Sequence, residues 1–237
     1  MKKFITIAAL ILGVLFIFSA TSVFAQYAYF GVKGGINLAN VWGEDTDPDG
    51  ALFIGWDDKK IKIGFAAGGY STIVLTNWFA LQPELLFTMQ GTSYEYSEEL
   101  PGYSFWVKET LKLGYIQLPV LLKFYIPMEG NVKINAFAGP YVAYNVYAKA
   151  RVQVEETGFE DYDEIEDIED DWGWGVRKFD YGAVAGAGVD FIIKGRQLTV
   201  DARYTIGFAN IFQDLTGWPE DPVFRNGTIS VMVGIGF

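Results

Sequence analysis

The chain ends in Thr228-Ile-Ser-Val-Met-Val-Gly-Ile-Gly-Phe237, where every second residue is apolar and the last is aromatic. Successive side chains of an extended strand point to opposite faces. The apolar face carries Ile229, Val231, Val233, Ile235 and Phe237. The opposite face carries Thr228, Ser230, Met232, Gly234 and Gly236. The stretch therefore predicts a strand with one apolar face and one small or polar face.

Seven further segments alternate in the same way. They span residues 27–41, 61–75, 79–90, 115–126, 132–147, 179–191 and 198–209. The connections between the eight segments are short at 75–78, 127–131 and 194–197, and long at 43–60, 97–107, 151–178 and 212–226. Short and long connections alternate, as they do in barrels with short periplasmic turns and long outer loops. This order predicts an all-β fold: an eight-stranded, antiparallel, up-and-down transmembrane β-barrel with both termini periplasmic.

A soluble lipocalin-like barrel also has eight strands, but it turns apolar residues toward its cavity. Alternation alone does not separate the two folds. One class of alternating positions holds the Gly residues and isolated charges, whereas the other is almost uncharged over spans of ~10 residues. Aromatic residues also gather near the short-turn end, as a membrane girdle would: Tyr27, Tyr29, Trp78, Phe79 and Tyr125. These features favour the membrane barrel.

The first 25 residues are typical of a secretory signal peptide. Two Lys residues precede an apolar run from Phe4 to Phe18, and small residues precede the expected cut after Ala25. The run is shorter than the ~20 residues of a spanning helix. The chain has no Cys, which excludes a lipoprotein anchor and disulfides. We expect residues 1–25 to be removed and residues 26–237 to form a barrel domain in the bacterial outer membrane.

The composition argues against several functions. The formal net charge is −11, and an acidic balance opposes nucleic-acid binding, which requires a basic surface. The chain has no His, the commonest general base in enzymes. It contains no phosphate loop, zinc spacing or dinucleotide fingerprint. The sequence therefore predicts a protein that is not an enzyme, binds no nucleic acid and needs no cofactor.

Six pieces of the chain, in order, resemble the PorT-like outer-membrane β-barrel family. They are Phe30-Gly-Val-Lys-Gly-Gly-Ile-Asn-Leu38, Leu81-Gln-Pro-Glu-Leu-Leu-Phe87, Tyr115-Ile-Gln-Leu-Pro-Val-Leu-Leu-Lys123, Phe137-Ala-Gly-Pro-Tyr141, Tyr181-Gly-Ala-Val-Ala-Gly-Ala-Gly-Val189 and Asp201-Ala-Arg-Tyr204. Together they span nearly the whole chain after the signal peptide. The resemblance implies an eight-stranded, porin-like barrel in the outer membrane and implies no activity. The founding member of that family is linked to a protein-secretion system. The residues quoted above give no reason to assign that role to this chain.

Six charged residues fall at inward positions in the half of the barrel nearest the short turns: Lys33, Glu84, Lys123, Asp190, Asp201 and Arg203. At ~3.3 Å per residue they lie within one or two layers of each other. We expect the three bases and three acids to pair, because an unpaired buried charge is costly. Two interpretations stay open. The network is either a polar plug, since an eight-stranded barrel has room only for its own side chains, or a narrow ion or proton path.

The third long connection holds a run of carboxylates between residues 155 and 171, with no Lys or Arg among them. The candidate cation-binding residues in this run are Glu160, Asp161, Asp163 and Glu164. Three interpretations stay open: a solvated, self-repelling loop, a divalent-cation site that bridges lipopolysaccharide phosphates, and a docking surface for a basic partner.

The segment Asp45-Thr-Asp-Pro-Asp-Gly50 resembles the first half of a Ca²⁺ loop, with acids at Asp45, Asp47 and Asp49 and a Gly after them. It lacks the closing acid, because Trp56 occupies the twelfth position, and Asp, Pro and Gly are ordinary turn residues. The segment is therefore either a cation-binding loop or a plain turn.

Two classes of function remain. The first is a structural or surface-binding barrel that lies in outer-membrane lipid and lipopolysaccharide and whose outer loops bind an envelope protein, a surface polymer or divalent cations. The second is a narrow channel or a subunit of an envelope transport or secretion machine. We favour the first class, a non-enzymatic binding or structural role.

Overall fold

The computed structural model of the protein describes residues 27–44, 59–168, 175–213 and 223–237. The predicted signal peptide, 1–25, and the predicted cation residues Asp45, Asp47 and Asp49 lie outside the described residues. Within the described ranges, no helix is long and apolar enough to cross a membrane.

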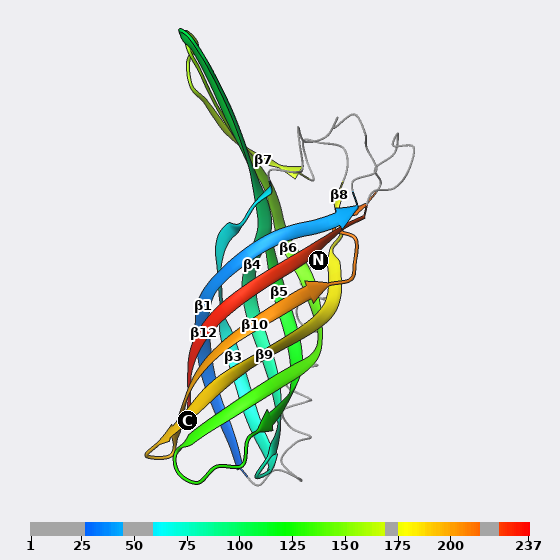
Figure 1. Cartoon of the computed structure of the whole chain (residues 1–237). Coiled ribbons are helices and arrows are strands. Elements are labelled where there is room, and N and C mark those ends of the chain that lie inside the picture. The colour runs from blue at the N-terminus through cyan, green and yellow to red at the C-terminus, as the bar shows by residue number, and fades with distance from the viewer. Residues whose placement is uncertain (1–26, 45–58, 169–174, 214–222) are drawn as a thin grey trace.

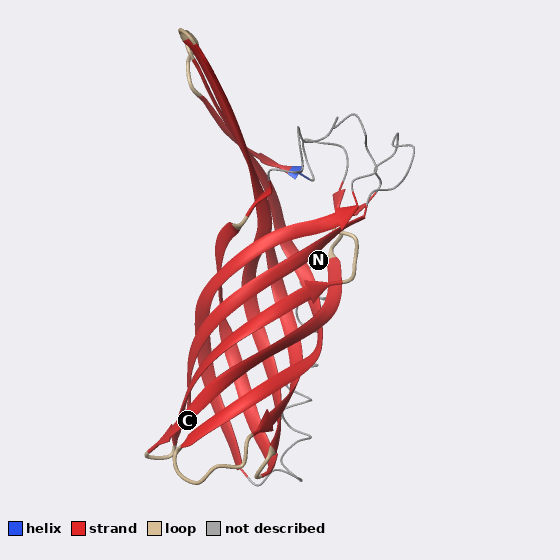
Figure 2. Cartoon of the chain, in the orientation of Figure 1, coloured by secondary structure: helices blue, strands red, loops and turns tan. Residues whose placement is uncertain are grey.

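Eight long antiparallel strands form a closed ring (Figures 1 and 2). In ring order they are β1 (Tyr27–Glu44), β3 (Lys62–Thr76), β4 (Phe79–Leu100), β5 (Tyr103–Tyr125), β6 (Val132–Glu156), β9 (Phe179–Ile193), β10 (Arg196–Gly207) and β12 (Val223–Gly236). Each strand pairs with the next along the chain, and β12 closes on β1. The prediction of an eight-stranded up-and-down barrel is confirmed.

The apolar face of the ring is the outer one. In β12 the exposed fractions of Ile229, Val231 and Val233 are 50%, 55% and 50%, whereas Thr228 and Ser230 are 3% and 5% exposed. Large apolar side chains on the outside and polar ones inside are what a lipid-embedded barrel requires. This polarity is the reverse of that of a soluble lipocalin-like barrel, so the soluble alternative is wrong.

The two ends of the barrel differ. At the turn end, the strands are joined by the predicted short connections. The two-residue connection between β9 and β10 places Lys194 and Gly195 at φ of 50° and 79°, in the left-handed region that such a hairpin needs. Phe237 lies at the same end, and its N–H donates to the Phe30 carbonyl at 2.9 Å. The opposite end, which carries the long connections, is called the loop end here.

A protruding sheet extends beyond the loop end, where long loops were predicted at 97–107 and 151–178 (Figure 1). It consists of residues 93–100 of β4, 103–112 of β5, 149–156 of β6 and β7 (Tyr162–Asp167), with the short strand β2 (Lys59–Lys60) against β4. The prediction that these segments are loops is wrong. Acids such as Glu98, Glu109 and Glu156 interrupt the apolar face of these strands, so the apolar period is weaker here although the backbone ladder continues.

The aromatic girdle at the turn end differs in part from the predicted one. Trp78 and Phe79 lie on the outside and pack with Phe124, with ring centroids 6.2 and 5.2 Å from that ring. Tyr27 and Tyr29, however, share the face of the inward Lys33, and the Tyr125 hydroxyl donates to Asp190 at 2.9 Å. These three Tyr side chains belong to the lumen side and not to the lipid-facing girdle, because strand period decides the face.

Candidate functional site in the barrel lumen

Six charged side chains lie together inside the turn-end half of the barrel. Lys33 comes from β1, Glu84 from β4, Lys123 from β5, Asp190 from β9, and Asp201 and Arg203 from β10. None of these residues is more than 5% exposed. The structure thus brings together all six of the lumen residues singled out from the sequence.

The centre of the network is a cluster of two acids and two bases. The Arg203 guanidinium donates to Glu84 at 2.6 and 3.2 Å and to Asp201 at 2.8 and 3.0 Å. The Lys33 ammonium donates to the same two carboxylates, at 2.9 Å each. Each carboxylate therefore faces two cations, the arrangement that offsets the cost of removing charges from water.

A second group surrounds Asp190. Lys123 lies 2.8 Å from one of its carboxylate oxygens, and Tyr125 and Gln197 donate to it at 2.9 and 2.8 Å. Gln82 joins the two groups, because its amide donates to Glu84 at 2.8 Å and its carbonyl oxygen accepts from Lys123 at 3.1 Å. The six charges therefore belong to one hydrogen-bonded network.

Glycines on neighbouring strands make room for these long side chains. Lys33 is in register with Gly68 of β3 and Gly234 of β12. Arg203 and Asp201 are in register with Gly186 and Gly188 of β9. A Cβ built at Gly234 would lie 2.9 Å from the Cβ of Lys33, closer than side-chain carbons approach each other. The inward glycines thus leave the lumen volume to the charged network.

Two aromatic rings of the network were not singled out from the sequence. The Lys33 ammonium lies 5.0 Å from the centroid of the Tyr70 ring, and the Arg203 guanidinium lies 5.2 Å from that of Phe137. Rings at this distance attract cations in a desolvated site. Strand alternation places both rings on the inner face. It does not show that they contact the charged network, because an aromatic residue carries no charge by which to recognise it as a network member.

A second polar layer lies farther toward the loop end. The Tyr141 hydroxyl and the Asn226 amide both donate to Asp180, at 3.1 Å each, and Asn226 also donates to the Tyr115 hydroxyl at 3.2 Å. Asp180 and Tyr115 lay at inward positions of the predicted strands, whereas Asn226 falls in the predicted fourth loop. The three strands involved in these contacts with Asp180 are thereby tied across the lumen.

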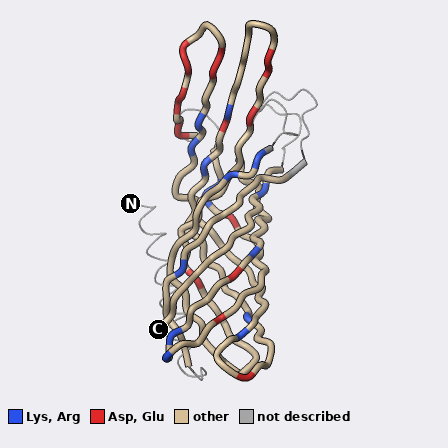
Figure 3. The backbone as a smooth tube through the Cα atoms, turned by 60° about the vertical axis from the view of Figure 1, so that its left-hand side comes forward, with Lys and Arg blue, Asp and Glu red and all other residues tan. Residues whose placement is uncertain are grey.

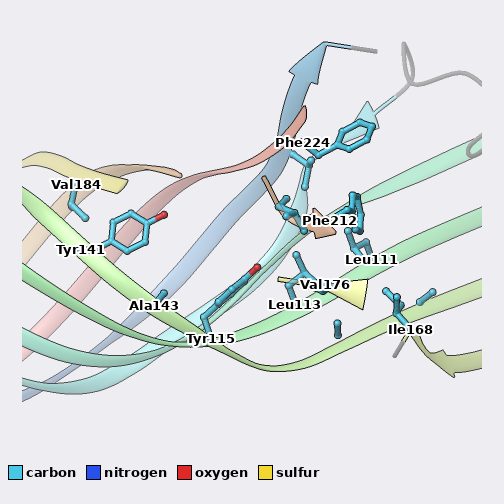
Figure 4. Close-up of a cluster of buried hydrophobic side chains, with 14 of the residues drawn as sticks. Leu111, Leu113, Tyr115, Tyr141, Ala143, Ile168, Val176, Val184, Phe212 and Phe224 are labelled. Carbon is cyan, nitrogen blue, oxygen red and sulfur yellow. The ribbon is translucent and has the colours of Figure 1, made fainter. Parts of the chain in front are cut away.

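An apolar cluster covers the loop end of the lumen (Figure 4). The small strands β8 (Gly175–Val176) and β11 (Phe212–Gln213) pair with each other there. Val176, Phe212 and Phe224 are buried with Leu111 and Leu113. The charged positions predicted a polar plug or a narrow ion path in the turn-end half of the lumen. That expectation does not describe the loop end, where segments outside the ring contribute apolar side chains that a strand pattern does not assign.

The comparison with protein families decides what kind of barrel this is. The family model of the outer membrane protein beta-barrel domain matches residues 24–213. The chain belongs to this outer-membrane barrel family. No curated protein matches the chain. The finer PorT-like assignment stays a prediction.

Solved structures of several outer-membrane barrels are similar to this one. Ail of Yersinia pestis, solved in complex with the heparin analogue sucrose octasulfate, is 13% identical, with a TM-score of 0.36 and coverage of 90% of this chain and 100% of Ail. Neisserial surface protein A is 14% identical, with a TM-score of 0.39 and coverage of 90% and 100%. OprG of Pseudomonas aeruginosa is 10% identical, with a TM-score of 0.45 and coverage of 90% and 96%.

The four predicted cation residues of the acidic run, which lie within the described ranges, do not converge. Asp163 and Glu164 are neighbours in β7, so they point to opposite faces of the sheet. Asp163 accepts two hydrogen bonds from Arg151, at 2.6 and 2.9 Å. These bonds hold the pKa of the Asp163 carboxyl below its usual range. Glu160 and Asp161 precede β7, and across the described ranges no three acidic side chains are grouped closely enough to hold a metal ion. A cation site stays a prediction.

The lumen of this outer-membrane barrel is suited to holding strands together. Three acids and three bases neutralise each other inside it, and each makes a charge-assisted hydrogen bond. A catalytic acid or base needs a proton that it can exchange with a substrate. Groups locked in mutual ion pairs and at most 5% exposed do not offer one.

Proposed function

We propose that this outer-membrane barrel is a non-enzymatic surface-binding protein, with a wall in lipid, a lumen closed by its own side chains and a protruding sheet at the cell surface. The lumen network carries the proposal. All six of its charges are buried and bonded to opposite charges. An ion crossing the barrel would have to separate these pairs, and separating a buried pair costs several kcal/mol, about 3–5.

The apolar cluster adds a second barrier. Val176, Ile211 and Phe212 are at most 3% exposed and lie between the network and the loop end. A hydrated ion would lose its water there without gaining polar contacts, which is costly. The two barriers lie in series, so loosening one of them leaves the other in place.

The orientation is part of the proposal. Bacterial barrels of this type keep short turns in the periplasm and long connections outside. On that basis the turn end and both termini are periplasmic, and the protruding sheet lies outside the cell. The exposed apolar wall contacts lipid, and its outer edge contacts lipopolysaccharide.

The protruding sheet supports a binding role because its two faces differ. The face that continues the lumen side carries Tyr103, Phe105 and Val154 together with Glu98, Glu109, Glu156 and Glu164, and no Lys or Arg of the β4, β5, β6 and β7 segments of the sheet shares that face. The opposite face carries Lys108, Lys112, Lys149 and Arg151. Figure 3 shows acidic positions along both protruding hairpins. A face of carboxylates and aromatic rings suits a basic, partly apolar partner.

Planar-bilayer recording tests the closed lumen. We expect the purified barrel, without its signal peptide, to give no steady conductance, while a known porin reconstituted in parallel conducts. A triple substitution of Lys33, Glu84 and Arg203 by Ala empties the centre of the network but leaves the apolar cluster in place, so we expect this variant to give no steady conductance either. Steady conductance steps from the unsubstituted protein would refute the closed-lumen proposal.

Charge reversal on the two faces tests the binding role. Glu98 and Glu156 lie on the lumen-side face, and their neighbours Glu99 and Glu155 lie on the other. We expect E98K/E156K to weaken binding of a synthetic peptide of alternating lysine and valine at least about tenfold, and E99K/E155K to leave it nearly unchanged. Equal losses in both variants, which have the same net charge, would reject a face-specific site.

A further inference from the structure

Two lysines face each other on the outer face of the protruding sheet. Lys112 of β5 is in register with Lys149 of β6, and both lie on the side that continues the lipid-facing wall. Like charges directly opposite each other in an antiparallel pair destabilise it. Neither ammonium forms an ion pair within the described part of the chain. The pair is therefore an unfavourable arrangement that nothing else in the fold explains.

Two acids of this face are bound by other groups. Asp163 is bound by Arg151, and Glu95 accepts hydrogen bonds from Lys60 and Trp106 at 3.0 Å each. Asp167 is in register with Lys149 on the far side of β6. Lys112 has Gly91 as its other register partner, and glycine contributes no side chain. Lys112 thus has no acid in register with it on either neighbouring strand.

The position along the strand places the pair at the edge of the membrane. Phe124 belongs to the aromatic girdle at the turn end, and Gly114 lies about ten residues farther along β5, the length of a transmembrane strand. Gly114 is in register with Tyr147, whose ring lies 6.4 Å from that of Phe87. These rings mark the interface at the loop end. Lys112 is two residues beyond it, about 7 Å along the strand.

We propose that Lys112 and Lys149 bind a phosphate group of lipopolysaccharide in the outer leaflet. Two ammonium groups that form no ion pair within the described residues lie where the headgroups of that leaflet begin. A phosphate between them accepts hydrogen bonds from both ammonium groups, and its negative charge offsets the repulsion between the two positive charges. The ligand is a lipid, because the site adjoins the apolar wall that holds its acyl chains. This inference rests on the proposed orientation, with the loop end at the cell surface.

Lys112→Glu gives a two-part test. The substitution places opposite charges across the β5–β6 pair, so we expect the thermal midpoint in detergent without lipopolysaccharide to rise. Added lipopolysaccharide raises the midpoint of the unsubstituted protein, because a ligand that binds only the folded state stabilises it. We expect that increment to be lost in the variant, with binding weakened at least about tenfold. Lys149→Glu should also lose the lipopolysaccharide increment. Its midpoint without lipopolysaccharide should rise less than that of Lys112→Glu, because the new carboxylate also lies opposite Asp167.

Controls separate the site from general electrostatics. Lys133→Glu makes the same charge change at the turn end and should leave the lipopolysaccharide increment intact. Inorganic phosphate at the same phosphate concentration should produce no increment. Equal losses in Lys112→Glu and Lys133→Glu, or a full increment from inorganic phosphate, would overturn the proposal. Purified protein in detergent has no orientation, so the midpoint measurement tests only the lipopolysaccharide site. Labelling of introduced Cys residues on intact cells tests the proposed orientation separately.

Discussion

Arg203 and Glu84 are joined by two hydrogen bonds, of 2.6 and 3.2 Å, although 119 residues separate them in the chain. They come from strands on different sides of the ring, so the contact crosses the lumen. Paired donors in a planar guanidinium match the two oxygens of a carboxylate, and this geometry makes the bond both strong and directional. The contact ties β4 to β10, which share no backbone pairing.

The network should be strongly coupled. We expect Arg203→Met or Glu84→Leu alone to lower the free energy of unfolding by about 3–5 kcal/mol, because each leaves an uncompensated charge in the lumen. The double variant removes one charge of each sign and leaves Lys33 with Asp201 and Lys123 with Asp190. It should therefore cost less than the sum of the single variants. Urea unfolding of the barrel in lipid vesicles measures this coupling, and additive effects would contradict it.

The seam between the first and last strands should not tolerate a methyl group at Gly35. A Cβ there would collide with the backbone oxygen of Val231 in β12. At the neighbouring Gly34 the nearest atom to an added Cβ, the Ala66 oxygen, lies at 3.6 Å, an ordinary contact. We expect Gly35→Ala to reduce the yield of folded barrel severely and Gly34→Ala to leave it nearly unchanged. The mobility shift of unheated samples in gel electrophoresis measures the yield, and similar yields would count against a tight seam.

Surface labelling should separate the two ends of the barrel. The chain has no Cys, so each introduced Cys is the only thiol. We expect Ser97→Cys in the protruding sheet to react with a membrane-impermeant maleimide on intact cells, and Asn77→Cys in the β3–β4 turn to react only after the outer membrane is broken. The opposite pattern would show that the loop end is periplasmic.

The hairpin formed by β6 and β7 should loosen in acid. The hydrogen bonds from Arg151 lower the pKa of Asp163 in the folded state. A lowered folded-state pKa contributes stability that is present above the unfolded value, about 3.9 for Asp, and is lost as the pH falls through the folded value. We expect hydrogen exchange of residues 150–166 to accelerate in that range while the ring stays protected. Asp163→Asn should exchange faster at neutral pH and lose this pH dependence.

Several features could be predicted from the residues alone. The period of two in β9, β10 and β12 marked the strands, and the alternation of short and long connections predicted their order around the ring. The same period placed Lys33, Glu84 and Arg203 on the inner face. Each of these inferences depends on local chain geometry, which a single strand already contains.

Other features depended on contacts that local geometry does not contain. The protruding sheet was predicted as loops, because Glu98, Glu109 and Glu156 interrupt the apolar face of its strands and weaken the apolar period. The sequence did not predict the apolar cluster at the loop end, because Val176 and Phe212 lie in short strands outside the ring. Tyr125 was placed in the girdle, although its hydroxyl reaches Asp190.

The amino-acid sequence by itself determined the eight-stranded barrel and which side chains face inward, since strand period and turn chemistry act within a few residues. Tertiary structure alone decided which charges pair, what covers the loop end, and that Lys112 meets Lys149. The physical reason is register. Partners across a barrel are set by the stagger of all eight strands as the ring closes, and no single strand specifies that stagger.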